Sequence, residues 1–187
     1  MKAVLVILSV LALSAVAFEP RFLAQQSPLI PAKNVNLEAL SGNWYELRRV
    51  GFGFEANTAC SKVRLAENTK DGWDVTVTAR AGSATGQTVQ TVGTITAQGP
   101  VKNEVAAIGK FNAQFAQGAV TEFYVFAQHT DQKWVLFGSP DRKQFWLLSR
   151  YSSVDDNLVE LLENMSEESG FDISTFVHVD QNRQCFN

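Results

Sequence analysis

The chain has 187 residues, which is enough for one domain with a real core and too few for two comfortable ones. Hydrophobic residues make up 45% and the formal net charge is −3, a balance that indicates a globular protein and argues against nucleic-acid binding, which needs basic patches. Four Trp and thirteen Phe would fill a core or line an apolar pocket, and composition leaves both open.

The first residues carry the pattern of an export signal. Met1-Lys2 precedes an apolar segment that ends in the small-x-small sequence Ala15-Val16-Ala17. This segment is too short to span a bilayer, and no later stretch approaches the ~20 apolar residues of a spanning helix. The sequence therefore predicts a signal peptide over residues 1–17 and a secreted or secretory-lumen protein without a membrane span, although transient membrane contact stays open. A membrane anchor is the alternative.

Two cysteines, Cys60 and Cys185, both lie in the exported part. In an oxidising compartment a disulfide between them is the default expectation, and it would tie the early strands to the C-terminal tail. A thiol nucleophile is the alternative, but neither cysteine stands beside a His or at the start of a helix.

Residues 18–36 hold Pro20, Pro28 and Pro31 with few periodic apolar positions, which predicts an extended N-terminal arm. Residues 37–40 can make one helical turn, and Gly42 then stops it. The domain itself is expected to cover residues 37–187.

A succession of strands follows, each rich in β-prone residues and bounded by turn residues. The predicted strands are 44–50, 59–65, 73–81, 88–98, 104–111, 122–129, 133–138 and 144–151, with a short last strand over 175–181. Turn signals recur about every ten residues, which favours an antiparallel meander that forms a closed barrel or a sandwich. A parallel sheet would need crossover helices, and none intervene.

One helix is predicted between Ser153 and Gly170. Ser153 is a capping residue with a carboxylate three positions on, and Gly170 ends the helix. Apolar residues at helical spacing form a stripe that should pack on the outside of the sheet: Val154, Leu158, Leu161, Leu162 and Met165. Asn164 lies off this stripe and begins the sequon Asn164-Met165-Ser166, which makes it a candidate glycosylation site.

Two short motifs predict how the sheet closes. Gly42-Asn43-Trp44 opens the first long strand, and Leu148-Ser149-Arg150 ends the last one. A guanidinium that ends an apolar strand needs a partner, and stacking on a Trp face contributes about 0.5–2 kcal/mol. We therefore expect Trp44 and Arg150 to meet.

These motifs resemble signatures of the lipocalins. Gly42-Asn43-Trp44 is similar to the first signature, and Leu148-Ser149-Arg150 is similar to the third, whose Arg packs on that Trp. The run over 138–150, with the helix and residues 169–176, is especially similar to the bacterial outer-membrane lipocalin, apolipoprotein D and plant temperature-induced lipocalin group. The second signature is incomplete, because Thr130-Asp131-Gln132 lacks the aromatic residue, and residues 102–119 match poorly.

The resemblance implies an all-β fold: an eight-stranded antiparallel up-and-down barrel with one C-terminal α-helix packed outside. Gly42, Trp44 and Arg150 would close one end. Cys60 and Cys185 stand where many lipocalins place a strand-to-tail disulfide.

The other end of such a barrel is implied to be an apolar cup for a ligand. The two-residue period of strands selects its lining, with Trp146 and Leu148 on the face of Arg150. A rim that holds Arg48 with Tyr124 and Gln128 would suit a fatty acid, and an internal Glu46–Arg48 pair is the alternative. A filled core without a cavity also stays open. The predicted ligand-binding residues are Glu46, Arg48, Phe54, Val75, Val77, Tyr124, Phe126, Val135, Phe137, Trp146 and Leu148.

The function implied is a secreted carrier of a small hydrophobic ligand such as a fatty acid, lysophospholipid, sterol, retinoid or bilin-like pigment. It would perform no chemistry, hold no metal or resident cofactor, and exist as a monomer or small homo-oligomer. The alternatives are a protein-interaction or inhibitor lipocalin, with the loop of Phe52 and Phe54 as its interface, and a lipocalin-type enzyme, whose known isomerase uses a free cysteine inside the barrel.

Overall fold

The computed structural model describes residues 27–68, 72–102, 105–116 and 118–186. The predicted signal peptide, residues 1–17, lies outside this part of the chain. Within it, residues 27–36 run along the barrel, and Leu29 is buried on the side that faces the C-terminal helix.

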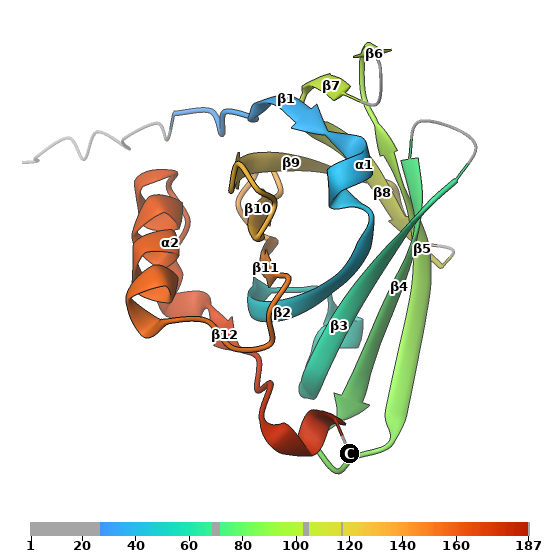
Figure 1. Cartoon of the computed structure of the whole chain (residues 1–187), viewed down its shortest axis with the longest axis vertical. Coiled ribbons are helices and arrows are strands. Elements are labelled where there is room, and N and C mark those ends of the chain that lie inside the picture. Colours follow the sequence, from blue (N-terminus) through green and yellow to red (C-terminus); the bar gives the residue numbers. More distant parts are fainter. Residues whose placement is uncertain (1–26, 69–71, 103–104, 117, 187) are drawn as a thin grey trace, which may run out of the picture.

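Eight antiparallel strands form a closed barrel, which confirms the predicted fold (Figure 1). They are β2 (Gly42–Val50), β3 (Thr58–Glu67), β4 (Gly72–Ala81), β5 (Thr88–Ala97), β8 (Lys110–Phe115), β9 (Thr121–Gln128), β10 (Trp134–Gly138) and β11 (Phe145–Ser149). Each strand pairs with the next along the barrel, and β11 pairs back onto β2, where Ser149 lies opposite Tyr45. Closure removes the exposed sheet edges that an open meander would leave.

A second, three-stranded sheet stands beside α1 (Leu37–Leu40) at one end of the barrel (Figure 1). Its strands are β1 (Lys33–Asn36), β6 (Val101–Lys102) and β7 (Val105–Ile108). The single strand predicted over 104–111 is therefore wrong, because the chain leaves one sheet and enters another at Gly109. A Cβ atom on Gly109 would lie 2.7 Å from the carbonyl oxygen of Val125, so only glycine fits where the backbones approach this closely.

Trp44 and Arg150 meet at this end of the barrel, as predicted. The Arg150 guanidinium carbon lies 3.6 Å from the centroid of the fully buried Trp44 ring. Arg150 also donates hydrogen bonds to the carbonyl oxygens of Ala39, Ser41 and Asn43, at 2.6, 2.9 and 2.8 Å. One arginine therefore joins the end of β11 to α1 and to the start of β2.

Helix α2 (Asp156–Glu168) packs on the outside of the barrel, as predicted (Figure 1). Leu162 is buried there among residues of β2, β10 and β11. The capping residue is Asp155, whose side chain accepts from the N–H of Asn157, so the predicted Ser153 cap is wrong. Leu161 is 54% exposed and does not belong to the buried stripe, whereas Val159 and Ser166 of the same helix are buried.

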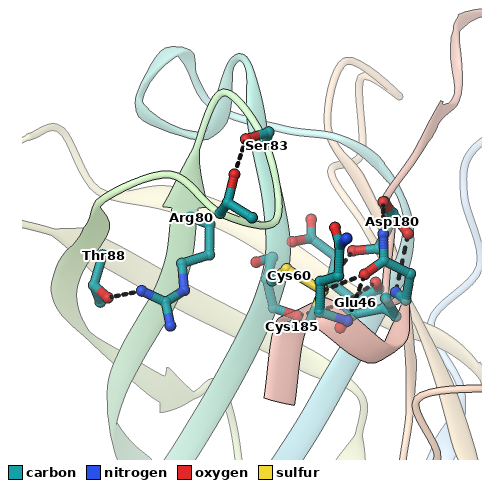
Figure 2. Close-up of a disulfide and its surroundings, with 12 residues drawn as sticks. Glu46, Cys60, Arg80, Ser83, Thr88, Asp180 and Cys185 are labelled. Atoms are coloured by element: carbon teal, nitrogen blue, oxygen red, sulfur yellow. Dashed lines mark hydrogen bonds between the residues drawn. A yellow bond between two sulfur atoms is a disulfide. The ribbon is translucent and has the colours of Figure 1, made fainter. Parts of the chain in front are cut away.

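The C-terminal segment contains β12 (Val177–His178) between two short 3₁₀ helices, η2 (Ile173–Thr175) and η3 (Arg183–Phe186). It fills a gap, because β2 pairs with β3 only over Gly42–Tyr45. The side chain of Gln181 spans the gap by donating to the carbonyl oxygens of Glu46 and Ser61, at 2.9 and 2.6 Å. The predicted Cys60–Cys185 disulfide is present and anchors this segment to β3 (Figure 2).

Candidate functional site

The barrel interior contains a small, almost wholly apolar cavity. Its free volume is about 50 Å³, so it has room for only a few waters. Twelve of its lining side chains are apolar and one is a carboxylate: Val63, Leu65, Val75, Val77, Ile95, Phe111, Ala113, Phe115, Phe123, Phe137, Trp146, Leu148 and Glu55. We call this cavity and its lining the cup.

The loop between β2 and β3 covers the cup with phenylalanine side chains. This loop, residues 51–57 with the 3₁₀ turn η1 (Gly53–Glu55), is called the Phe52 loop below. The Phe52 ring centroid lies 5.3 Å from that of Phe115, 5.5 Å from Trp146 and 6.0 Å from Phe123. Phe54 stacks on Phe52 at 5.3 Å and is 40% exposed. The rings thus form one contiguous cluster over the wall residues Phe115, Phe123 and Trp146, called the aromatic cover below, and the cup stays partly open.

Glu55 is the polar member of the cup. It is 4% exposed, and its carboxylate accepts from the indole N–H of Trp146 at 3.1 Å and from the backbone N–H of Phe52 at 2.7 Å. Burial raises the pKa of Glu55 above its ordinary value, while those two hydrogen bonds and the charge of Arg49 oppose the shift. The carboxylate therefore links the Phe52 loop to β11 and presents a hydrogen-bond acceptor to an otherwise apolar space.

A second buried carboxylate, that of Glu46, is linked to the Phe52 loop through Arg49. Arg49 donates to Glu46 at 3.2 Å and to the backbone carbonyls of Glu55 and Thr58 at 2.7 and 3.0 Å. Burial, and then the neighbouring charge of Glu55, raises the pKa of Glu46 from 4.5 to about 7, and Arg49 opposes this. The Arg49 charge is thus committed to Glu46 and to the backbone, and Arg49 is not among the side chains that line the cup.

Arg48 lies outside the barrel, so its predicted place at the rim of the cup is wrong. Its guanidinium bonds to Glu163 of α2 and to His178. The cause is a register irregularity: Leu147 and Leu148 of β11 lie opposite Arg48 and Glu46, which leaves Leu47 as an extra residue in β2. The extra residue shifts the inward–outward alternation of β2 by one position. Glu46 therefore faces inward as predicted, but its inward-facing neighbour is Arg49 and not Arg48. The predicted Glu46–Arg48 pair is a Glu46–Arg49 pair.

Tyr124 and Phe126 also lie outside, and their predicted inward placement is wrong. Both belong to the cluster beneath α2, whereas Phe123 and Val125 face the interior. The ammonium of Lys110 lies 5.0 Å from the centroid of Tyr124, which places Lys110 outside as well. Because α2 covers this side of the barrel, β9 is apolar on both faces, and its alternation does not reveal which face is inward.

The structure places five of the predicted ligand-binding residues on the wall of the cup: Val75, Val77, Phe137, Trp146 and Leu148. Glu46 and Val135 are buried in the interior but do not line the cavity, and Phe54 lies in its cover. That any of them contacts a ligand stays a prediction. Sequence reasoning missed Glu55, whose one signal was a carboxylate beside two phenylalanines in a glycine-rich loop.

The remaining candidates lie on the surface. His129 is half-buried and His178 is exposed, and the described residues contain no group of three His, Cys, Asp or Glu side chains that could hold a metal ion. Asn164 is exposed on α2, so its glycosylation stays a prediction. In the same part of the chain, no helix is long and apolar enough to cross a membrane.

Comparison with known proteins agrees with this architecture. Residues 35–181 match the family model of the lipocalin-like domain. No curated protein matches the sequence. Insecticyanin from the tobacco hornworm Manduca sexta is 19% identical with a TM-score of 0.64, and the match covers 84% of this chain and 86% of that one. For H1 crustacyanin from the lobster Homarus americanus the identity is 14%, the TM-score 0.60 and the coverage 84% and 92%. At such identities the solved structures establish a shared fold.

Proposed function

The chain belongs to the lipocalin-like family, and on that premise we propose that its barrel binds and carries a small hydrophobic molecule without changing it chemically. The observation that carries this proposal is the lining of the cup, in which twelve of thirteen side chains are apolar. Such a lining holds a ligand by burial of apolar surface, at about 25 cal/mol per Å². A side chain positioned for bond-making is not required for that task.

Ligand entry requires the aromatic cover to move. Pockets for ligands of retinoid or sterol size occupy roughly 300–1,000 Å³, whereas the cup has about 50 Å³ free. The Phe52 loop is the part that we expect to open, because its Phe54 side chain is already 40% exposed. We therefore assign this loop the role of a lid.

We also propose that the protein acts outside the cytosol. The Cys60–Cys185 disulfide supports this, because such bonds persist in oxidising compartments. The predicted signal peptide would supply the export route. N-terminal sequencing of protein recovered from the medium of a secreting host should begin after Ala17, and retention of the uncleaved chain in the cell would contradict export.

The carrier function is tested by asking what the purified protein holds. Native mass spectrometry, followed by solvent extraction, should detect a bound hydrophobic molecule in protein purified without detergent. If the protein is empty, it should take up added retinol with a saturable rise in retinol fluorescence. A protein that is empty and does not bind retinol, a fatty alcohol or a fatty acid is not a carrier.

One observation favours a second candidate, a protein-interaction role. Phe54 is a large apolar side chain that is exposed beside the cup, as an interface residue would be. Size-exclusion chromatography of the Phe54→Ser variant distinguishes the two roles, since an unchanged oligomeric state favours a lid. A cysteine-dependent enzyme has no support, because both cysteines are in the disulfide; one thiol titrating in the native protein would reopen it.

A further inference from the structure

The cup offers a ligand one charged group, and that group is an anion. Among the lining side chains only Glu55 carries an ionisable group, and it is 4% exposed. Each of its carboxylate oxygens accepts one protein hydrogen bond, from Trp146 or from Phe52. A carboxylate has about four acceptor positions, so Glu55 retains capacity for a donor from a ligand.

The cations that could neutralise an anionic ligand lie elsewhere. Arg49 is committed to Glu46 and to two backbone carbonyls, and Arg48 is paired with Glu163 outside the barrel. Lys110 lies over Tyr124 on the outer face, and Arg150 is bonded to three carbonyls at the closed end. An anionic head group in the cup would therefore lose its hydration, find no cation on the lining, and face the Glu55 carboxylate.

We propose that the cup selects hydrophobic molecules that carry a hydrogen-bond donor, either an alcohol or an amine, and that it discriminates against fatty acid anions. Glu55 accepts the hydrogen bond from that donor. This specificity rests on the proposed carrier function. The apolar lining takes the hydrocarbon body, and the hydroxyl or ammonium group lies against Glu55 beneath the Phe52 loop. A donor left without an acceptor in an apolar pocket is disfavoured, which makes a single buried acceptor a strong selector.

Three probes with the same hydrocarbon chain test this proposal: decanol, decylamine and decanoate, each titrated calorimetrically into the full disulfide-bonded protein at about pH 8, where decanoate is ionised. We expect the alcohol and the amine to bind at least about tenfold more tightly than decanoate, the range of one hydrogen bond to a charged group. Glu55→Gln should reduce that preference to under about threefold, because an amide can donate to the carboxylate of decanoate. Glu160→Gln removes the same charge from an exposed position on α2 and should keep the preference.

The outcomes separate this specificity from the carrier function. Decanoate binding as tightly as decanol in the native protein would overturn the specificity and leave the carrier function standing. No binding of any probe would overturn the carrier function itself. A preference that persists in Glu55→Gln would remove Glu55 from its assigned role. If Glu55→Gln does not fold, the test uses the affinities of the three probes for the native protein and for Glu55→Asp, which keeps the charge. Equal binding of decanol and decanoate to both proteins would overturn the proposal.

Discussion

A Cβ atom on Gly51 would lie 2.1 Å from Oε2 of Glu55, so the missing side chain at residue 51 is what allows the Glu55 carboxylate to turn toward the cup. Gly53, in the same loop, has no heavy atom within 4 Å of its Cβ position. The Phe52 loop therefore contains one glycine that Glu55 requires and one that it does not.

Gly51→Ala should displace Glu55 and loosen the Phe52 loop, because the contact is far shorter than non-bonded atoms tolerate. The loss of the Phe52 and Trp146 hydrogen bonds should lower the free energy of unfolding by about 1–3 kcal/mol. Gly53→Ala is the matched control and should lie within about 0.5 kcal/mol of the native protein. Chemical denaturation measures both variants, and equal stabilities would contradict the assigned role of Gly51.

The closed end should be the most sensitive part of the fold. Trp44→Ala removes a fully buried indole and the surface on which Arg150 stacks, so we expect a loss of about 3–5 kcal/mol. Arg150→Lys keeps the charge but cannot reproduce three carbonyl contacts and the stacking, and it should cost about 1–3 kcal/mol. Arg64→Lys on the exposed face of β3 is the control. An unchanged melting temperature in Trp44→Ala would refute the pairing.

Removal of the disulfide should loosen the contacts that the C-terminal segment makes across the gap between β2 and β3, which is called the seam below. The double variant Cys60→Ser, Cys185→Ser frees the C-terminal segment whose Gln181 spans this seam, and we expect a loss of about 2–5 kcal/mol. Hydrogen exchange should then be faster at the backbone amides of residues 60 and 179, which donate to the carbonyl oxygens of Asp180 and Leu47. Unchanged exchange at both amides would show that the seam closes without the disulfide.

Stability should fall as the pH rises between about 4.5 and 7. The pKa of Glu46 is raised from 4.5 to about 7 in the folded protein, so the folded state binds a proton more tightly than the unfolded chain across this window. The stabilising contribution is complete below the unfolded value and lost as the pH passes the folded one. Glu46→Gln cannot titrate, and its melting temperature should decline less over the same interval. Parallel curves for the variant and the native protein would contradict the shift.

The fold could be predicted from the sequence because its determinants are local. Gly42-Asn43-Trp44 and Leu148-Ser149-Arg150 mark the two strands that close the barrel, and regular alternation defines β4 between them. Helical spacing predicted the α2 stripe except for Leu161, which is exposed. Strand spacing and alternation left a closed barrel and a sandwich open, and the resemblance of the two motifs to lipocalin signatures implied the eight-stranded barrel. The disulfide was the default expectation for two exported cysteines.

The site was less predictable because its geometry depends on pairing between strands. The extra residue Leu47 in β2 arises from the register between β2 and β11, and no feature of the sequence over residues 44–50 predicts it. On β9 the choice between Phe123 and Tyr124 depends on where α2 packs. Glu55 enters the cup from a loop, where no periodicity applies. Because of this one register irregularity, Arg49 faces the interior instead of Arg48 and is paired with Glu46. The cation that the sequence placed at the rim of the cup, which would have suited a fatty acid, therefore lies outside the barrel.

The most direct test of the central claim, that a donor-bearing hydrophobic ligand occupies the cup beside Glu55, uses a decanol brominated next to its hydroxyl-bearing carbon. Bromine quenches an indole only near contact, and Trp146 lines the cup while Trp134 lies beneath α2. We predict saturable quenching of the native protein that persists in Trp134→Phe and is largely lost in Trp146→Phe. Quenching that persists in Trp146→Phe and is lost in Trp134→Phe would place the ligand outside the barrel and contradict the account.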